Sequence, residues 1–208
     1  MSLPYHISLA PEKDMLLMAP CEALSSLRKE ETHVHEEAVT LPANREIILE
    51  TVNGNGIEII TEFDLPENGI LEMKILRSSD NTEYTKITVC RNRGAFHFAK
   101  NELYSVLSLD CTHSQLAIHS DNKFLAPSAP DSEEFRLYPD EKIKLHVFID
   151  RSSVDVFCND RVCISKIVYP TKNDSIGVSV PSLAVDGEML SVDAWEMDAI
   201  DPSDLTAL

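Results

Sequence analysis

Apolar and polar residues alternate through most of this chain, and the clearest run is KIKLHVFIDRSSVDVFCNDRVCISKIVYP at residues 142–170. Every second residue is apolar over 143–149 and again over 154–158, the period that places one face of a strand against a core. Between these two segments, Ser152 and Ser153 have small hydroxyl side chains that bond to nearby backbone. The pattern therefore predicts two strands joined by a turn.

A second turn is predicted at Asn159 and Asp160, which tolerate positive φ, with a third strand over 162–168. The rest of the chain from Glu46 onward reads as short strands separated by Asn, Asp, Gly, Pro and Ser. We expect these strands at 46–52, 57–63, 70–76, 84–91, 95–98, 103–109, 115–119, 134–138, 175–180 and 188–197.

Short strands at this spacing predict an all-β fold with two packed antiparallel sheets, a jelly-roll or concanavalin-like (lectin-like) β-sandwich. Asn53-Gly54-Asn55-Gly56 predicts a hairpin between the strands at 46–52 and 57–63. The segment 121–132, which contains two prolines, is expected to be irregular.

The first thirty residues differ from the rest. Residues 5–20 read as two short extended pieces joined by a polar turn at 11–14. A short linker helix is expected to follow, because Pro20 suits a first helical turn and the spacing of Leu24 and Leu27 places them on one face.

Composition narrows the functional classes. The 208 residues are 43% apolar, enough for a substantial core, and carry a formal charge of −17. This acidity argues against binding to nucleic acid or to an anionic membrane. No apolar run reaches about twenty residues, the length that a membrane-spanning helix needs.

The five cysteines form an odd set without CxxC spacing, which fits neither a disulfide framework nor a zinc ribbon. They indicate a reducing compartment, and we expect a cytoplasmic protein. A bridge between Cys158 and Cys163, across the second turn, is the alternative.

The central run also contains a sequence motif that is specific to one protein family. LHVFIDRSSVDVFCND resembles the DRSSVEVF motif in the C-terminal β-sandwich of glycoside hydrolase family 32, which includes invertases, levanases, inulinases and sucrose-6-phosphate hydrolases. Asp155 stands where the family usually has Glu, and Arg161 where a turn Gly is common. The residues that carry the motif, to which we assign a structural role, are Asp150, Arg151, Ser152, Ser153, Asp155 and Phe157.

The N-terminal segment LLMAPCEALSSLR is similar to the join between the catalytic and C-terminal domains of that family. The resemblance implies that residues 1–20 are a remnant of the last strand of a missing catalytic propeller, and Met1-Ser2-Leu3 looks like an expression start. Residues 21–31 are then the linker helix, 32–200 the β-sandwich and 201–208 a tail.

Catalytic residues are not carried over by the resemblance. Retaining cleavage of a fructosidic bond needs two carboxyl groups about 5 Å apart. The family places them in WMNDPNG, RDP and EC motifs of an N-terminal five-bladed propeller, and none of these motifs occurs here. The resemblance implies a non-catalytic module that packs on its own propeller and stabilises it, with a homodimer as a further option. The parent enzyme would cleave sucrose, sucrose 6-phosphate or fructan.

Asp150 and Asp155 are the best candidates for another acid/base pair. The alternative, which we prefer, is a hydrogen-bonded network that uses Arg151 and the serine hydroxyls to pin the turn. An acid pair on strands without a pocket motif rarely indicates catalysis.

An HxHEE cluster at His33, His35, Glu36 and Glu37 has the side chains to gather a divalent metal on an extended segment. Two ligands within reach do not make a closed site, so we favour a polar surface after the linker helix. We therefore expect neither a metal nor a cofactor.

A competing hypothesis is an independent carbohydrate-binding or oligomerisation module with no enzyme attached, because lectin-like sandwiches stack sugars on exposed aromatic rings. Trp195 alternates with Ala194 and Glu196 in a predicted strand and is expected to fill the core. The other candidates for such weak glycan binding are Phe96, Phe98, Tyr104, Phe124, Phe135 and Tyr138.

Overall fold

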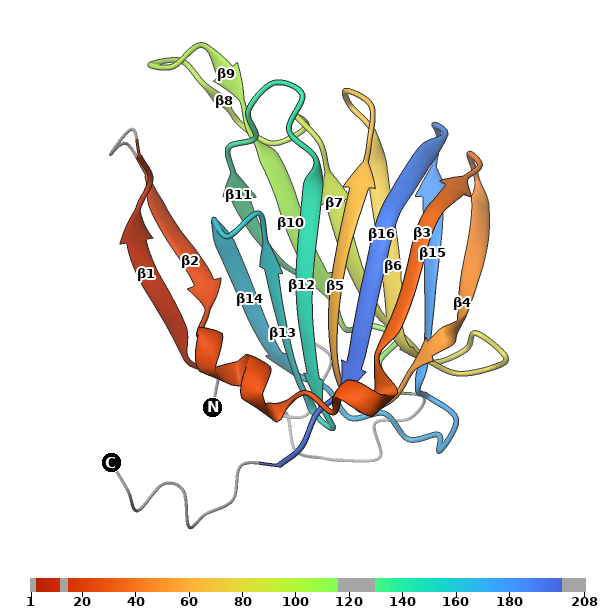
Figure 1. Cartoon of the computed structure of the whole chain (residues 1–208). Helices are drawn as coiled ribbons and strands as arrows, with labels where there is room; N and C mark the ends of the chain where they lie inside the picture. Colours follow the sequence, from red (N-terminus) through yellow and green to blue (C-terminus); the bar gives the residue numbers. More distant parts are fainter. Residues whose placement is uncertain (1–2, 12–14, 116–129, 200–208) are drawn as a thin grey trace, which may run out of the picture.

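The computed structural model describes residues 3–11, 15–115 and 130–199, and in it two six-stranded antiparallel sheets pack face to face (Figure 1). The first sheet has the order β11 (Asp131–Phe135), β10 (Ser105–Asp110), β7 (Thr85–Cys90), β6 (Ile70–Arg77), β15 (Gly177–Leu183), β4 (Arg45–Asn53). The second has the order β14 (Val162–Ile167), β13 (Ser153–Cys158), β12 (Ile143–Asp150), β5 (Gly56–Asp64), β16 (Gly187–Glu196), β3 (Val34–Leu41). The predicted β-sandwich is confirmed.

The three-stranded ribbon β12–β13–β14 forms as predicted. Asp150 pairs with Ser153, which leaves a two-residue turn in which Arg151 adopts a φ of 52°. The second turn begins with Asn159 and Asp160, both at positive φ (51° and 53°). The second turn therefore lies where it was predicted, whereas the first comprises Arg151 and Ser152, one residue earlier than predicted, because Ser153 already belongs to β13.

The main core fills the space between the sheets. The alternating residues of β12 and β13 point into it, and their side chains are buried. Cys158 also faces this core, whereas Cys163 pairs with Phe157 and lies on the opposite face of the second sheet. The alternative of a Cys158–Cys163 bridge is therefore wrong, because a one-residue offset in a strand reverses the side-chain direction.

The Asn-Gly-Asn-Gly segment does not form the predicted hairpin. β4 and β5 belong to different sheets, so residues 53–56 carry the chain from one layer to the other. The backbone bonds of the turn go to other loops: Gly54 N donates to Ile176 O (2.8 Å), and Asn55 O accepts from Arg151 N (2.6 Å). Gly54 has a φ of 148°, which favours glycine here, but the local turn geometry does not decide which sheet β5 joins.

The N-terminal segment forms a separate hairpin, β1 (Tyr5–Leu9) paired with β2 (Leu16–Pro20), which stands beside the second sheet (Figure 1). The predicted linker helix is helical but is split into two short 3-10 helices, η1 (Glu22–Leu27) and η2 (Glu30–Thr32). Arg28 and Lys29 between them are extended, because their backbone pairs with the end of β16 instead of continuing a helix.

Smaller differences concern strand limits. The strand expected at 95–98 is only β8 (Phe96–His97), which forms a small hairpin with β9 (Glu102–Leu103). Most of the strand expected at 115–119, the aromatic Phe124 and the tail at 201–208 lie outside the described residues. Among the described residues no helix has the length and apolar character needed to cross a membrane. The division into remnant, linker and sandwich stays a prediction.

Candidate functional site

Within the DRSSVDVF motif, Val154 and Val156 face the core between the sheets, whereas Asp155 and Phe157 lie on the outer face of the second sheet. Asp155 is buried there and bonds to two hydroxyls: Ser165 Oγ donates to Oδ1, and Ser153 Oγ donates to Oδ2 at 3.4 Å. The backbone carbonyl of Ser152 accepts from Val168 N (2.7 Å). These bonds tie β13 to β14 and to the segment that follows it.

The other charged residues of the motif are not part of this network. Asp150 and Arg151 are exposed at the end of β12 and in the turn. Within the part of the chain that the structure describes, the hydrogen bonds to the Asp155 carboxylate come from serine hydroxyls, so the expected contribution of Arg151 to the network is wrong. The structure thus places one exposed and one buried acid here; the assignment of the six motif residues to a structural role stays a prediction.

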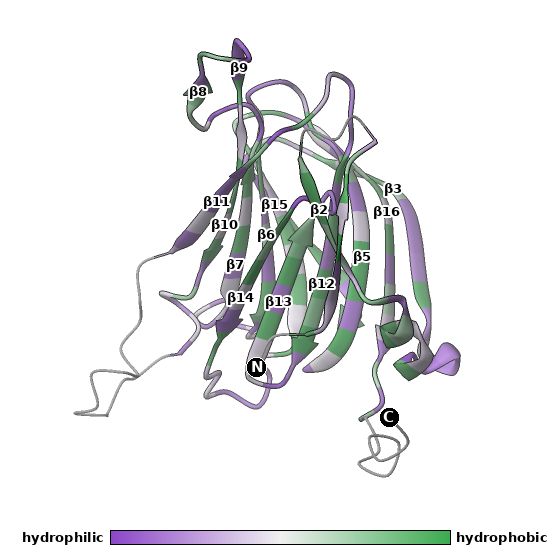
Figure 2. Cartoon of the chain, turned by 90° about the vertical axis from the view of Figure 1, so that its left-hand side faces the viewer, coloured by the Kyte–Doolittle hydropathy of each residue, from purple (hydrophilic) through white to green (hydrophobic). Residues whose placement is uncertain are grey.

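A second apolar cluster covers the outer face of β12 and β13. Its buried members are Leu24 from the linker, Phe148 and Phe157. Phe157 contacts Phe148 edge-on with ring centroids 6.3 Å apart, and Tyr5 of β1 edge-on at 6.4 Å. The predicted apolar side of the linker therefore packs on the sheet, and Figure 2 shows the hydrophobic stripes of β2, β12 and β13 that lie on this side of the molecule.

A charged group lies next to this cluster. Glu58 of β5 is only 1% exposed, and its carboxylate accepts hydrogen bonds from Arg28 Nε (2.8 Å) and Nη2 (2.7 Å). His146 Nε2 lies 2.6 Å from Glu58 Oε1. Burial works to raise the pKa of Glu58, but the hydrogen bonds and charges of Arg28 and His146 outweigh it and lower the pKa below its ordinary value.

Trp195 is buried, but not in the sandwich core as predicted. It pairs with Glu58 across β16 and β5 and therefore shares the outer face with it. The Arg28 guanidinium lies 4.1 Å from the centre of the Trp195 ring, and His33 stacks against the ring at 4.5 Å with an interplanar angle of 3°. Arg28 of the linker and His33, which directly precedes β3, thus cover the tryptophan, whose exposed fraction is 8%.

The HxHEE cluster is divided between different partners. His33 Nε2 and His35 Nδ1 both lie 2.8 Å from Asp193 Oδ1, while Thr51 Oγ1 donates to Glu36. His35 Nε2 is 3.2 Å from Glu37 Oε1. Among the described residues, no three His, Cys, Asp or Glu side chains are arranged to hold one metal ion.

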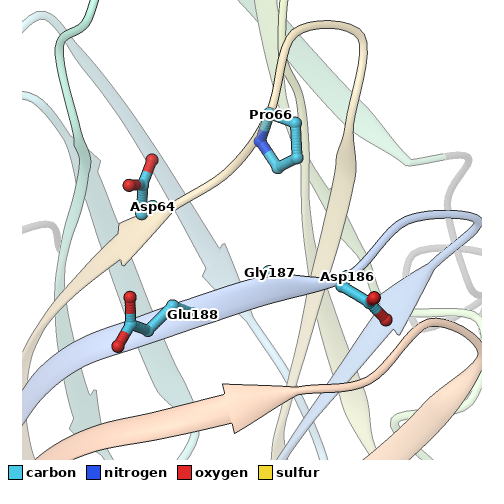
Figure 3. Close-up of a pocket in the computed structure, with 5 residues that line it drawn as sticks. All are labelled: Asp64, Pro66, Asp186, Gly187 and Glu188. Carbon is cyan, nitrogen blue, oxygen red and sulfur yellow. The ribbon is translucent and has the colours of Figure 1, made fainter.

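A shallow pocket of about 370 Å³ lies where β5 ends and β16 begins (Figure 3). Asp64, Asp186 and Glu188 line it together with Pro66 and Gly187. Two of its acids are already engaged, because Lys142 pairs with Asp64 at 2.5 Å and the backbone N of Ala43 donates to Asp186 at 2.7 Å. We assign this pocket no chemistry.

Sequence reasoning missed the seam between the linker and the second sheet, which we define as Arg28, Glu58, His146 and Trp195. The alternation in 57–63 and 143–149 does place Glu58 and His146 on outward faces, and this is the one signal present in the sequence. Nothing local to Arg28 indicates a partner thirty residues later.

The fold and the seam define a class: an antiparallel β-sandwich whose incoming linker is fixed to one outer face by a buried ion pair. A family model described as "Glycosyl hydrolases family 32 C terminal" matches residues 23–196. The chain belongs to this family, as the DRSSVDVF resemblance predicted.

Comparisons with individual proteins agree with this family assignment. The chain is 26% identical over 167 residues to the fructan beta-fructosidase of Streptococcus mutans, a match that covers 80% of this chain and 10% of that protein. Fructan 1-exohydrolase IIa from Cichorium intybus superposes with a TM-score of 0.80 at 16% identity, covering 96% of this chain and 41% of that one. For the exo-inulinase from Aspergillus awamori the TM-score is 0.66 at 22% identity, covering 96% and 36%. The chain thus spans less than half of each of these proteins, and the two structural matches show a shared fold.

Proposed function

We propose that this chain is the non-catalytic C-terminal module of a β-fructofuranosidase that acts on sucrose, sucrose 6-phosphate or fructan. Family membership and the similarity to a protein named fructan beta-fructosidase support the proposal. So does the sequence, which lacks the WMNDPNG, RDP and EC motifs that the resemblance assigns to a catalytic propeller. In this proposal the propeller precedes residue 20.

The observation that carries the supporting role is the bidentate pair between Arg28 and Glu58. A linker fixed by a buried ion pair holds the preceding domain at a defined orientation, whereas a flexible linker would let it rotate. Ile7 and Leu9 lie on one face of the N-terminal hairpin beyond the contact of Tyr5 with Phe157, and both are more than half exposed. Burial of this face against a propeller would contribute about 25 cal/mol per Å² of apolar area.

The test compares the full-length enzyme, the enzyme ending at residue 20, and this 208-residue chain. We expect fructose release from sucrose or inulin by the full-length enzyme and none by this chain. Loss of the module should lower the melting temperature of the catalytic part. Fructose release by this chain alone, or equal melting temperatures with and without the module, would contradict the proposal.

The proposal includes a cytoplasmic location and allows a homodimer. The location is supported by five cysteines that are all free, with burial raising the pKa of the Cys111 thiol. Light scattering of the full-length enzyme after size-exclusion chromatography measures the oligomeric state.

A further inference from the structure

The structure separates the aromatic residues weighed as sugar platforms. Phe135 is buried in the core, and Phe124 lies outside the described residues. Tyr104 stacks on His97 with ring centroids 3.7 Å apart, and two arginine guanidinium groups lie within 5.0 Å of the centre of the Tyr138 ring. The remaining two, Phe96 and Phe98, are exposed, and both belong to the hairpin formed by β8 and β9.

The exposed rings form a corner at one end of the sandwich. Phe98 is 88% exposed, Phe96 42% and Leu103 45%. Phe96 pairs with Leu103 across the hairpin, so both lie on one face. The rings of Phe96 and Phe98 are 5.0 Å apart and nearly perpendicular, at 83°. Figures 1 and 2 both show this hairpin projecting beyond the ends of the neighbouring strands.

The opposite side of the hairpin is firmly held. His97 stacks on Tyr104, and Arg136 Nη2 donates to Glu102 Oε1 at 2.7 Å. The turn is closed by Lys100 N, which donates to His97 O at 3.0 Å. An apolar corner fixed in this way loses little conformational entropy when a ligand binds. Its exposure therefore indicates a binding surface rather than a loose loop end.

The small size of this apolar corner and the net charge of the chain indicate which kind of ligand it can bind. A stable protein interface uses about 20–30 residues on each side, and this corner offers three large apolar side chains. The chain carries a net charge of −17, which opposes binding of an anionic ligand. A neutral sugar chain meets neither obstacle, because the apolar C–H face of a sugar ring packs on an aromatic ring.

We propose that the Phe96–Phe98 corner binds neutral fructan chains and holds the polymer to the module. This inference rests on the proposed function, because the parent enzyme supplies the reason for a fructan. The corner would raise the local concentration of polymer at the attached catalytic domain without taking part in bond cleavage.

The test is affinity electrophoresis of the 208-residue chain in gels that contain inulin, levan or dextran. We expect inulin or levan, but not dextran, to retard the chain, and Phe98→Ala to weaken this binding about tenfold. Phe98 is almost fully exposed, so its replacement leaves the fold intact, which circular dichroism verifies. Tyr169→Ala is the matched control, since Tyr169 is 44% exposed and lies outside the hairpin; it should bind like the unchanged chain.

Three results would overturn the inference: no retardation by any fructan, equal retardation of Phe98→Ala, or equal retardation by dextran. A lower melting temperature of the full-length enzyme on Phe98→Ala, without fructan binding by this chain, would assign the corner to a contact with the catalytic domain instead. The proposed function is tested separately by fructose release from the full-length enzyme. Release without binding refutes only the present inference, and binding without release refutes only the function.

Discussion

Arg28 of the linker and Glu58 of β5 are thirty residues apart in sequence and form a bidentate ion pair in which the carboxylate is 1% exposed. Removal of the guanidinium would leave the buried carboxylate with the His146 imidazole, 2.6 Å from Oε1, in place of two guanidinium hydrogen bonds. We expect Arg28→Ala to lower the free energy of unfolding by about 3–5 kcal/mol, measured by urea denaturation of this chain.

The matched control for this pair is the adjacent Lys29, which lies near Glu196 and Asp198 at 3.5 and 3.4 Å on the surface. Lys29→Ala should have a much smaller effect. The double variant Arg28→Met, Glu58→Leu should recover most of the lost stability, because no charge stays buried. An equally small loss for Arg28→Ala would contradict a buried pair.

Phe157 fixes the N-terminal hairpin to the sandwich through its contacts with Tyr5 and Phe148. We expect Phe157→Ala to destabilise the chain by about 3–5 kcal/mol, since it empties the centre of the second apolar cluster. Limited proteolysis should then cut faster within residues 3–20 than within the sandwich. Uniform acceleration over the whole chain would mean that the two parts unfold together.

Stability should fall at low pH because of Glu58. Its folded pKa lies below the ordinary value, so its contribution is complete above the unfolded pKa of about 4.5 and is lost as the pH falls through the folded pKa. Urea midpoints measured from pH 6 down to pH 3 should decline. The decline should be smaller in Glu58→Gln, whose overall stability is lower; equal slopes would contradict this assignment.

His35 should act in the opposite direction. Hydrogen bonds to Glu37 and Asp193 raise the pKa of His35 above its ordinary value. A raised folded pKa stabilises the fold fully below the unfolded pKa of about 6.5, and this contribution is lost as the pH rises through the folded pKa. Urea midpoints should therefore decrease from pH 6 to pH 8, and His35→Gln should remove part of that decrease. His6→Gln, at an exposed position in β1, is the control.

Asn159 and Asp160 share positive φ, yet glycine should affect them differently. Asn159 accepts from Lys144 N (3.1 Å) and donates to Lys142 O (2.8 Å), so Asn159→Gly should cost about 1–3 kcal/mol. The Asp160 carboxylate lies 4.0 Å from the Lys144 ammonium, and the bond from Met18 N (2.6 Å) goes to the Asp160 backbone carbonyl, which glycine keeps. Asp160→Gly should therefore change stability by less than about 1 kcal/mol. Thermal unfolding of both variants measures the difference.

Most strands were predictable because β12, β13 and β5 place an apolar side chain in the core at nearly every second position, which makes their alternation visible in the sequence. The prediction failed at residues 53–56, where the same glycines and asparagines serve a hairpin or a change of layer equally well. The choice between these is made by the partners of β4 and β5, which lie more than eighty residues further along the chain.

The linker seam was beyond prediction for a related reason. Trp195 was expected in the core because large aromatic side chains seek burial, and it is indeed buried. Its cover comes from Arg28 and His33, which precede it by more than 160 residues. Side-chain direction can be deduced from alternation, but the segment that covers an outer face cannot.

The linker and the end of β16 also lie side by side: Arg28 pairs with Met197, and Asp198 N donates to Leu27 O at 2.7 Å. The chain therefore enters and leaves the sandwich at adjacent positions. A module with this geometry can be transplanted into a surface loop of an unrelated host with little distortion, or cut open elsewhere and rejoined at Leu27 and Asp198 as a circular permutant.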